Sequence, residues 1–502
     1  MKRHDVVVIG AGIAGLTAAA LLAKEGCDVL LVEAHHQSGG CAGTFRRGPF
    51  VFDVGATQVA GLEPGGSHAR VFHHLQVPLP AADRLDPACV VHLDDGSPPI
   101  QLWRDPQRWK REREDQFPGS ERFWALCHWL HQANWRFAGR DPVLPPRTLW
   151  DLQNLLSALD PGNLASGLLT LSSVADLLQL CGCARDQRLR RFLDLQLRLY
   201  SQEPAERTAA LYGATVLAMA QEPLGLWHLH GSMQRLSGTL EGALNRWGGT
   251  LQLRCRVTQL QPQRAGGWRL VCMGPDGRAS QLEAADVVCT LPPQLLPELL
   301  GEAMPAAYAR RIDSFGEPSG ALVLYGAVSR DRLPADVPGH LQRDWADPGS
   351  LFVSVSREGD GRAPSGQATV IASVFTPARP WFSLEPRAYE AAKAEAMAGI
   401  QRGLGALLGL EAGDWLHAEL STPRGFQRWT GRAMGYVGGL GQHPSRFGPF
   451  GLASRSPLPG LWLCGDSLYP GEGTAGVTLS ALTACRQLLA SRGRALILQD
   501  GA

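Results

Sequence analysis

The chain has 502 residues, of which 44% are hydrophobic and 19% are charged, and its formal net charge is +1. This length exceeds that of one small domain and predicts two or three hydrophobic cores. A charge so close to zero gives no field that would attract a polyanion, so we expect no nucleic-acid partner. The 11 cysteines lack the spacing of a zinc site or a disulfide framework, which favours packing thiols in a reducing compartment.

The first predicted elements are a strand, a glycine-rich turn, a helix and a second strand. Residues 5–9 form an apolar, β-branched run typical of a buried parallel strand, and residues 16–23 are rich in alanine and leucine, which favour a helix. A second apolar strand ends at Glu33. The uncharged run 6–23 could also be a signal peptide or a membrane span, but its spaced glycines and the strand after it favour a dinucleotide site.

Each residue of this turn has its own task in binding a dinucleotide. Gly10 permits the tight turn, Gly12 lets a pyrophosphate approach the backbone, and Gly15 lets the helix pack closely on the strand. The helix N-terminus, which includes Ala14, offers unpaired N–H groups and a positive dipole end to phosphates. Glu33 is expected to accept hydrogen bonds from ribose hydroxyls and to repel a 2′-phosphate, which disfavours NADP.

A second glycine-rich turn, residues 38–44, leads into an alternating strand at 50–55. The residues alone also fit an ordinary hairpin turn beside a strand. The string resembles the segment of flavin amine oxidases and carotene desaturases that wraps the ribityl chain of FAD. This resemblance implies that the step from Asp53 to Gly55 lies near the flavin ring. The cofactor contacts expected here are Gly39, Gly40, Gly43, Thr44, Gly55 and Ala56.

Two later segments have an unusual composition. Residues 103–135 interleave tryptophan with arginine, as single-stranded nucleic-acid sites do, but the acids among them favour a partly exposed helical face or an interfacial tryptophan belt. Residues 149–180 are rich in leucine near helical spacing, contain three acids and no base, and are divided at 161–162. This segment is either a pair of core helices or a lipid-facing patch through which an apolar substrate enters.

Segments in the middle of the chain extend the resemblance. Residues 230–236 resemble the turn that opens a helix in the same family, and the glycines at 248–249 end that helix. Residues 251–257 alternate with period two and predict one strand. The resemblance implies that Val257 meets the adenine through its backbone. Residues 285–290 look like the strand that returns toward the flavin.

The C-terminal region again combines an apolar strand, a glycine-rich turn and a helix. The strand at 461–464 ends in Gly-Asp, whose carboxylate can reach a ribityl hydroxyl, and residues 478–490 are helix-like. An ordinary strand-to-helix turn is the alternative. The pattern G-D-x(3)-P-G-x-G-x(2)-G-V resembles carotene desaturases and carotenoid isomerases, whereas amine oxidases usually have Gly-Glu here. The expected cofactor contacts are Gly465, Asp466, Gly473, Gly476 and Val477.

The resemblance spans nearly the whole chain and is strongest at its two ends. It implies an α/β fold in which a discontinuous Rossmann-type FAD-binding domain is joined to a mixed α+β substrate domain. FAD is the expected cofactor, and no metal is expected because the histidines lack ligand spacing. The FAD-binding domain is predicted at 1–75, 225–300 and 445–502, and the substrate domain at 76–224 and 301–444.

The resemblance also implies a reaction. Most such enzymes introduce a carbon–carbon double bond into a carotenoid, with hydride transfer to the flavin and loss of a proton from the neighbouring carbon. This chemistry needs orientation and a dry channel more than a strong base, and the sequence assigns no catalytic residue. Residues 55–66 look most like cyanobacterial C-3′,4′ carotenoid desaturases, which implies a 1′-hydroxylated carotene on the route to myxol-type xanthophylls.

Other functions stay open on the same residues. A carotenoid cis–trans isomerase that uses reduced FAD is the main alternative, ahead of an amine oxidase and a non-catalytic prenyl-binding protein. Arg424, Arg428 and Arg432 fall where the family approaches the flavin, although pairing with carboxylates explains them equally well. The expected partner is an apolar carotenoid, and the expected location is cytoplasmic and peripheral on a membrane. The motifs name no electron acceptor.

Overall fold

The computed structural model describes residues 2–345 and 350–498. Its first sheet has seven strands, in the order β10-β11-β12-β1-β2-β9, with β18 paired to β12. The central strand β1 (Arg3–Ile9) runs parallel to β2 (Val29–Val32) and β12 (Ala279–Cys289). The other strands are β9 (Thr250–Gln252), β10 (Arg256–Pro262), β11 (Trp268–Met273) and β18 (Leu461–Leu463).

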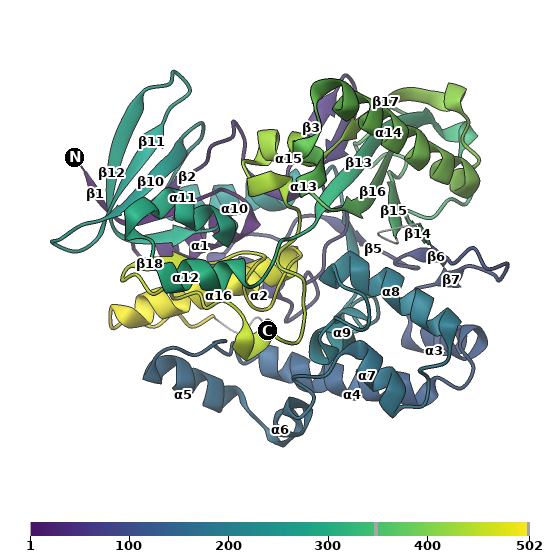
Figure 1. The fold of residues 1–502 in the computed structure, drawn as a ribbon, viewed down its shortest axis with the longest axis horizontal. Helices are drawn as coiled ribbons and strands as arrows, with labels where there is room; N and C mark the ends of the chain where they lie inside the picture. The colour runs from purple at the N-terminus through teal and green to yellow at the C-terminus, as the bar shows by residue number, and fades with distance from the viewer. Residues whose placement is uncertain (1, 346–349, 499–502) are drawn as a thin grey trace.

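Helices cover both faces of this sheet (Figure 1). On one face α1 (Ile13–Lys24) packs against α10 (Gln234–Arg246) and α16 (Thr474–Ser491). On the other face lie α11 (Leu296–Leu300) and α12 (Ala306–Asp313). The uncharged run 6–23 is therefore a strand and a helix of a buried core, and no helix in the described part of the chain is long and apolar enough to cross a bilayer.

The prediction of one continuous strand over 251–257 is wrong. The chain breaks between β9, which pairs with β2, and β10, which pairs with β11. Arg254 at the break has a φ of 56°, in the left-handed region that a strand excludes. Its N–H donates to the carbonyl of His35, and the N–H of Cys255 donates to that of Glu33. The segment therefore turns beside the end of β2 instead of continuing straight.

A second seven-stranded sheet has the order β17-β13-β16-β15-β14-β6-β7 and is antiparallel except between β14 and β6. Helix α14 (Pro386–Leu408) packs on one face through Ile400 and Leu404. The other face packs on a hairpin of β3 (Thr44–Arg47) and β4 (Phe50–Asp53). The strands are β6 (Val90–His92), β7 (Ile100–Gln101), β13 (Gly320–Ser329), β14 (His340–Arg343), β15 (Leu351–Val355), β16 (Gln367–Thr376) and β17 (Trp415–Ser421).

The helices between residues 106 and 216 lie below the two sheets in Figure 1, with α5 and α6 at the lower edge. The leucine-rich segment 149–180 forms three short helices instead of two. The three acids of the segment explain their starts, because Asp151, Asp160 and Asp176 each belong to a capping box. The helices are α3 (Pro106–Gln116), α4 (Glu121–Ala138), α5 (Leu149–Ala158), α6 (Pro161–Gly167), α7 (Val174–Leu180), α8 (Gln187–Ser201) and α9 (Ala210–Val216).

The remaining α-helices and strands connect these layers. They are α2 (Ser67–Leu75), β5 (Ala82–Arg84), β8 (Trp227–Leu229), α13 (Arg379–Ser383) and α15 (Pro423–Thr430).

A buried ion pair joins β4 to the loop between β15 and β16. Asp53 and Arg362 lie 3.0 Å apart, and their side chains are 1% and 4% exposed. The Asp53 carboxylate also accepts hydrogen bonds from the Thr44 hydroxyl (2.9 Å) and the Met233 N–H (2.8 Å), while Arg362 pairs with Asp360 at 3.2 Å. Asp53 therefore ties the second glycine-rich turn to the start of α10 and to the second sheet.

Candidate active site

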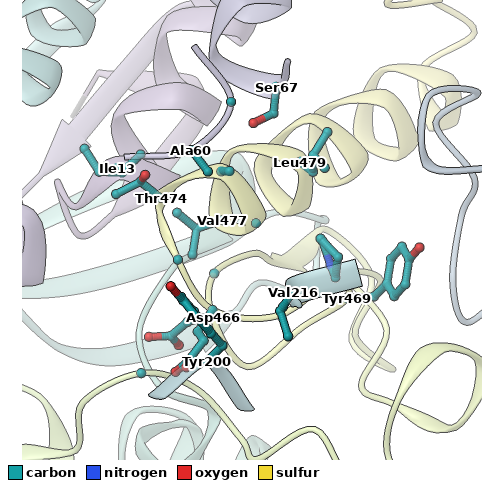
Figure 2. Close-up of a pocket in the computed structure, with 18 of the residues that line it drawn as sticks. Ile13, Ala60, Ser67, Tyr200, Val216, Asp466, Tyr469, Thr474, Val477 and Leu479 are labelled. Atoms are coloured by element: carbon teal, nitrogen blue, oxygen red, sulfur yellow. The ribbon is translucent and has the colours of Figure 1, made fainter. Parts of the chain in front are cut away.

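One cavity of about 740 Å³ extends from the glycine-rich turns beside the first sheet to helices α4, α5, α6, α8 and α9 and to the second sheet. Figure 2 shows side chains of distant segments around it: Ile13 of α1, Asp466 and Tyr469 after β18, and Tyr200 and Val216 of α8 and α9. Because residues from both ends of the chain surround it, only the folded chain assembles this site.

The first turn combines tight packing with an open position. A Cβ atom at Gly15 would lie 1.8 Å from the carbonyl oxygen of Gly10, and one at Gly10 would lie 2.5 Å from the Thr290 hydroxyl. A Cβ atom at Gly12 would meet no atom within 4 Å, and Gly12 lines the cavity. The fold therefore requires glycine at positions 10 and 15, whereas Gly12 leaves room for a group bound in the cavity.

Glu33 lies at this end of the cavity with its carboxylate held by the backbone. One oxygen accepts the Ala11 N–H at 2.7 Å, and the other accepts the His35 N–H at 2.8 Å. A carboxylate offers about four acceptor positions, so each oxygen retains capacity for a hydroxyl group. These acceptors suit the hydroxyls of a ribose, and the negative charge would repel a phosphate.

Most of the predicted contacts line the cavity, and a few lie elsewhere. Thr44 donates to Asp53 inside the protein, and Val257 is buried in β10, where it pairs with Cys272. Gly15 and Gly43 are also absent from the lining. The predicted residues that line the cavity are Gly10, Gly12, Ala14, Glu33, Gly39, Gly40, Gly55, Ala56, Gly465, Asp466, Gly473, Gly476 and Val477.

Asp466 forms an ion pair with Arg432 at 2.8 Å. Arg432 also donates to the carbonyls of Tyr436 (2.6 Å) and Gly438 (2.7 Å), which fixes its guanidinium. Of the three arginines singled out in the sequence, Arg432 lines the cavity, whereas Arg424 donates to the carbonyl of Trp381 and Arg428 lies over Trp429. The carboxylate pairing considered for these arginines therefore occurs at Arg432.

Sequence reasoning missed Glu472, which also lines the cavity. One carboxyl oxygen accepts hydrogen bonds from the Gln202 amide (2.6 Å) and the Gly439 N–H (3.3 Å). Burial, with a further contribution from the negative charge of Asp466, raises the pKa of Glu472 to about 8. The sequence offers one signal for it, a charged residue between Gly471 and Gly473 of the C-terminal glycine motif.

The far part of the cavity is mainly apolar and aromatic. The hydroxyls of Tyr200 and Tyr469 form no hydrogen bond within the described chain, and burial raises the pKa of both phenols. Tyr212 donates its hydroxyl to the carbonyl of Tyr200 at 2.6 Å. The other large side chains of this part include Trp135, Leu155, Leu159, Met219, Leu226, Phe352, Phe375 and Phe447.

Helices α5 and α6 separate this part of the cavity from solvent. Leu155, Leu159 and Asn163 line the cavity, while Leu164 and Leu168 on the outside are 63% and 87% exposed. We call the outer set the leucine surface. Because these side chains face solvent, α5 and α6 are not core helices. The leucine surface consists of Leu149, Leu152, Leu156, Leu164, Leu168 and Leu171.

Comparisons with known proteins agree with this architecture. The chain is 24% identical to a chloroplastic prolycopene isomerase of Arabidopsis thaliana over 98% of its own length and 83% of that protein. It is 26% identical to a hydroxyneurosporene desaturase of Cereibacter sphaeroides over 97% of both chains. The cyclohexylamine oxidase of Brevibacterium oxydans superposes with a TM-score of 0.61, at 17% identity over 98% of this chain and all of the other.

These similarities confirm the α/β fold predicted from the motifs and the resemblance to carotene desaturases and isomerases. The profile of flavin containing amine oxidoreductases matches residues 13–489, which is nearly the whole chain. The cavity fits FAD, because Gly12 leaves a side-chain-free approach to the N-terminus of α1 and Glu33 offers acceptors suited to a ribose. The chain therefore belongs to the flavin containing amine oxidoreductase family and is an FAD-dependent oxidoreductase.

Proposed function

We propose that this protein introduces a carbon–carbon double bond into a carotenoid. The observation that carries the proposal is the continuous cavity that joins the glycine-rich turns to an apolar region behind the leucine surface. Such a cavity suits a long apolar substrate whose reacting bond must reach a flavin. Two relatives that cover nearly all of this chain are named for carotenoid reactions, a desaturation and an isomerisation.

The lining residues suggest how FAD is held. Gly12 and Ala14 would present N–H groups of α1 to the pyrophosphate, and Glu33 would accept the ribose hydroxyls. Asp466, fixed by Arg432, would accept a ribityl hydroxyl, while Gly476 and Val477 at the start of α16 would approach the ring. When bound, FAD supplies a two-electron acceptor for hydride.

The protein itself would orient the polyene and exclude water. The aromatic and aliphatic lining offers dispersion contacts along a conjugated chain and few competing polar groups. The free hydroxyls of Tyr200 and Tyr469 could each bind a hydroxyl group within this lining. We therefore propose a 1′-hydroxylated carotene as the substrate and C-3′,4′ desaturation as the reaction.

We further propose that the leucine surface rests on a lipid bilayer. Six exposed leucines within one short segment are unusual on a protein surface, and this segment includes helices that line the cavity. An apolar substrate could then pass from the bilayer into the cavity without crossing water. The segment 149–180 carries no basic residue, so contact would depend on apolar burial more than on anionic lipids.

Isomerisation is the second candidate, and the full-length similarity to prolycopene isomerase favours it. Product analysis separates the two reactions. The purified protein with FAD is mixed without oxygen with a 1′-hydroxylated carotene in phosphatidylcholine vesicles, and the products are resolved by mass and by geometry. Desaturation yields a product lighter by two hydrogens. A product of unchanged mass and altered geometry, formed only after prior reduction of the flavin, would replace the desaturase by an isomerase.

A further inference from the structure

Four carboxylates line the cavity, and their surroundings differ. Glu33 has both oxygens bound by backbone N–H groups at the nucleotide end. Asp466 is paired with Arg432. Glu63 accepts the N–H of Gly61 at 3.1 Å and holds the turn before α2. Glu472 has no basic partner within ion-pair distance in residues 2–345 and 350–498, and within these residues only one of its oxygens accepts hydrogen bonds.

The charged and titratable groups around Glu472 come from three parts of the fold. Asp466 and Arg432 form an ion pair and act on Glu472 in opposite directions, since the negative charge of Asp466 raises its pKa and the positive charge of Arg432 lowers it. Tyr212 of α9 faces Glu472 from the substrate side, and its phenol stays protonated at neutral pH because burial raises its pKa. Gln202, after α8, contributes an uncharged amide donor. This environment favours an uncharged Glu472 at neutral pH without preventing its ionisation at alkaline pH.

We propose that Glu472 is the catalytic residue that exchanges the substrate proton, an inference that rests on the proposed carotenoid reaction. In desaturation, the substrate loses a hydride, which FAD accepts, and a proton from the adjacent carbon, which the Glu472 carboxylate accepts. The electron pair left by that proton forms the second bond of the new double bond. The substrate thus loses two hydrogens and two electrons, and Glu472 ends the step protonated.

Glu472 suits this role better than its neighbours. A base must be ionised when it acts and must not be neutralised by a fixed cation, which excludes Asp466. The phenols of Tyr200 and Tyr212 hold their protons too tightly, because burial raises their pKa. Glu472 also lies immediately before the N-terminus of α16, where the proposed flavin contacts Gly476 and Val477 begin.

The test compares Glu472→Gln with Glu63→Gln as the matched control, since both change a carboxyl that lines the cavity into an amide of the same shape. FAD content and carotene binding are measured first. The rate at which the flavin bleaches after anaerobic mixing with 1′-hydroxylated carotene is then followed from pH 6 to pH 9.5. In parallel, infrared difference spectra of the substrate-free proteins record the protonated carboxyl band over the same pH range.

We expect the wild-type bleaching rate to rise with pH through a midpoint near 8, because the base acts in its ionised form. Glu472→Gln should keep FAD and bind carotene, bleach about 100-fold or more slowly, and lose the pH dependence. The wild-type infrared titration near pH 8 should be absent from Glu472→Gln and present in Glu63→Gln. If Glu472→Gln fails to fold, Gln202→Leu serves instead, and loss of its hydrogen bond should move the midpoint to higher pH.

Two outcomes overturn the proposal, and a third concerns the function on which it rests. A Glu472→Gln protein that bleaches at the wild-type rate removes Glu472 from the reaction. If the pH midpoint of the bleaching rate is the same in wild type, Glu472→Gln and Gln202→Leu, another group accepts the substrate proton. If carotene bleaches the flavin neither in the wild type nor in any variant, while the infrared titration of Glu472 is still observed, the proposed carotenoid function is wrong.

Discussion

Backbone atoms form one end of the cavity, and side chains form the other. The end formed by the glycine-rich turns is mainly backbone, and its shape depends on positions where a side chain cannot fit, such as Gly10 and Gly15. The end behind α5 and α6 is formed by apolar side chains from separate helices and strands. A backbone site tolerates few substitutions and suits one cofactor. A side-chain site can be reshaped residue by residue, which suits the selection of a substrate.

The largest effects are expected when a side chain is added at the end of the cavity formed by the glycine-rich turns. Gly15→Val should prevent folding, at a cost above about 3 kcal/mol, because its Cβ atom would overlap the carbonyl oxygen of Gly10. Gly12→Val should fold normally, because a Cβ atom there would meet no atom within 4 Å, and should lose FAD, because the added side chain would enter the cavity where the pyrophosphate is proposed to bind. Gly242→Ala, on the exposed side of α10, is the control and should be neutral or stabilising. Thermal unfolding and flavin absorbance distinguish the three. A Gly12→Val protein with full FAD content would contradict the proposed pyrophosphate site.

The link between the ends can be tested at the ion pair between Asp53 and Arg362. Arg362→Met should lower the free energy of unfolding by about 3–5 kcal/mol, because it leaves the Asp53 carboxylate buried without its cation. Arg278→Met removes an exposed pair with Asp276 and should cost no more than about 1 kcal/mol. Denaturant unfolding measures both changes. Equal effects would show that the buried pair does not hold the second turn in place.

Sequence patterns predict the backbone end better than the side-chain end. The turn at 10–15 and the strands beside it follow from local glycine spacing and apolar runs. Asp53 and Arg362 are 309 residues apart, so no local pattern could pair them. The strand predicted at 251–257 failed because its alternation continues through Arg254, whose left-handed conformation is set by contacts with the end of β2.

The leucine-rich segment illustrates the same limit. Its composition predicted helices, but helical spacing does not reveal whether leucines face a core, a cavity or solvent. The fold places Leu155 and Leu159 on the cavity and Leu164 and Leu168 outside. Glu472 was overlooked for a related reason, because its burial and its neighbours Gln202 and Asp466 come from tertiary structure.

Protonation of Glu472 should also affect stability. Its pKa is raised by burial to about 8 in the folded protein, above the ordinary value of 4.5, so the folded state holds a proton that the unfolded state has released between these values. Its contribution to stability is present below pH 4.5 and is lost as the pH rises through 8. Relative to Glu472→Gln, the wild type should lose stability over this window, by about 1.4 kcal/mol per pH unit at most. Melting temperatures of both proteins from pH 5 to pH 9 measure the difference, and a constant difference would contradict the raised pKa.

The smallest expected effect on folding comes from the leucine surface. The double variant Leu164→Lys, Leu168→Lys should change the free energy of unfolding by less than about 0.5 kcal/mol, because both side chains are exposed. It should nevertheless weaken sedimentation with phosphatidylcholine vesicles, since two charges replace apolar contacts. Leu416→Lys, at a leucine of β17 that is 54% exposed, is the control and should bind vesicles as the wild type does. Equal binding by all three proteins would remove the leucine surface as the lipid contact.

The most direct test of the account is the flavin spectrum of the purified protein during anaerobic mixing with 1′-hydroxylated carotene in vesicles. The protein should carry FAD, and the carotene should bleach the flavin absorbance bands in a single turnover, because one cavity joins the glycine-rich turns to the apolar end. FAD that stays oxidised in the presence of bound carotene, yet is reduced by an amine, would contradict the proposed substrate class.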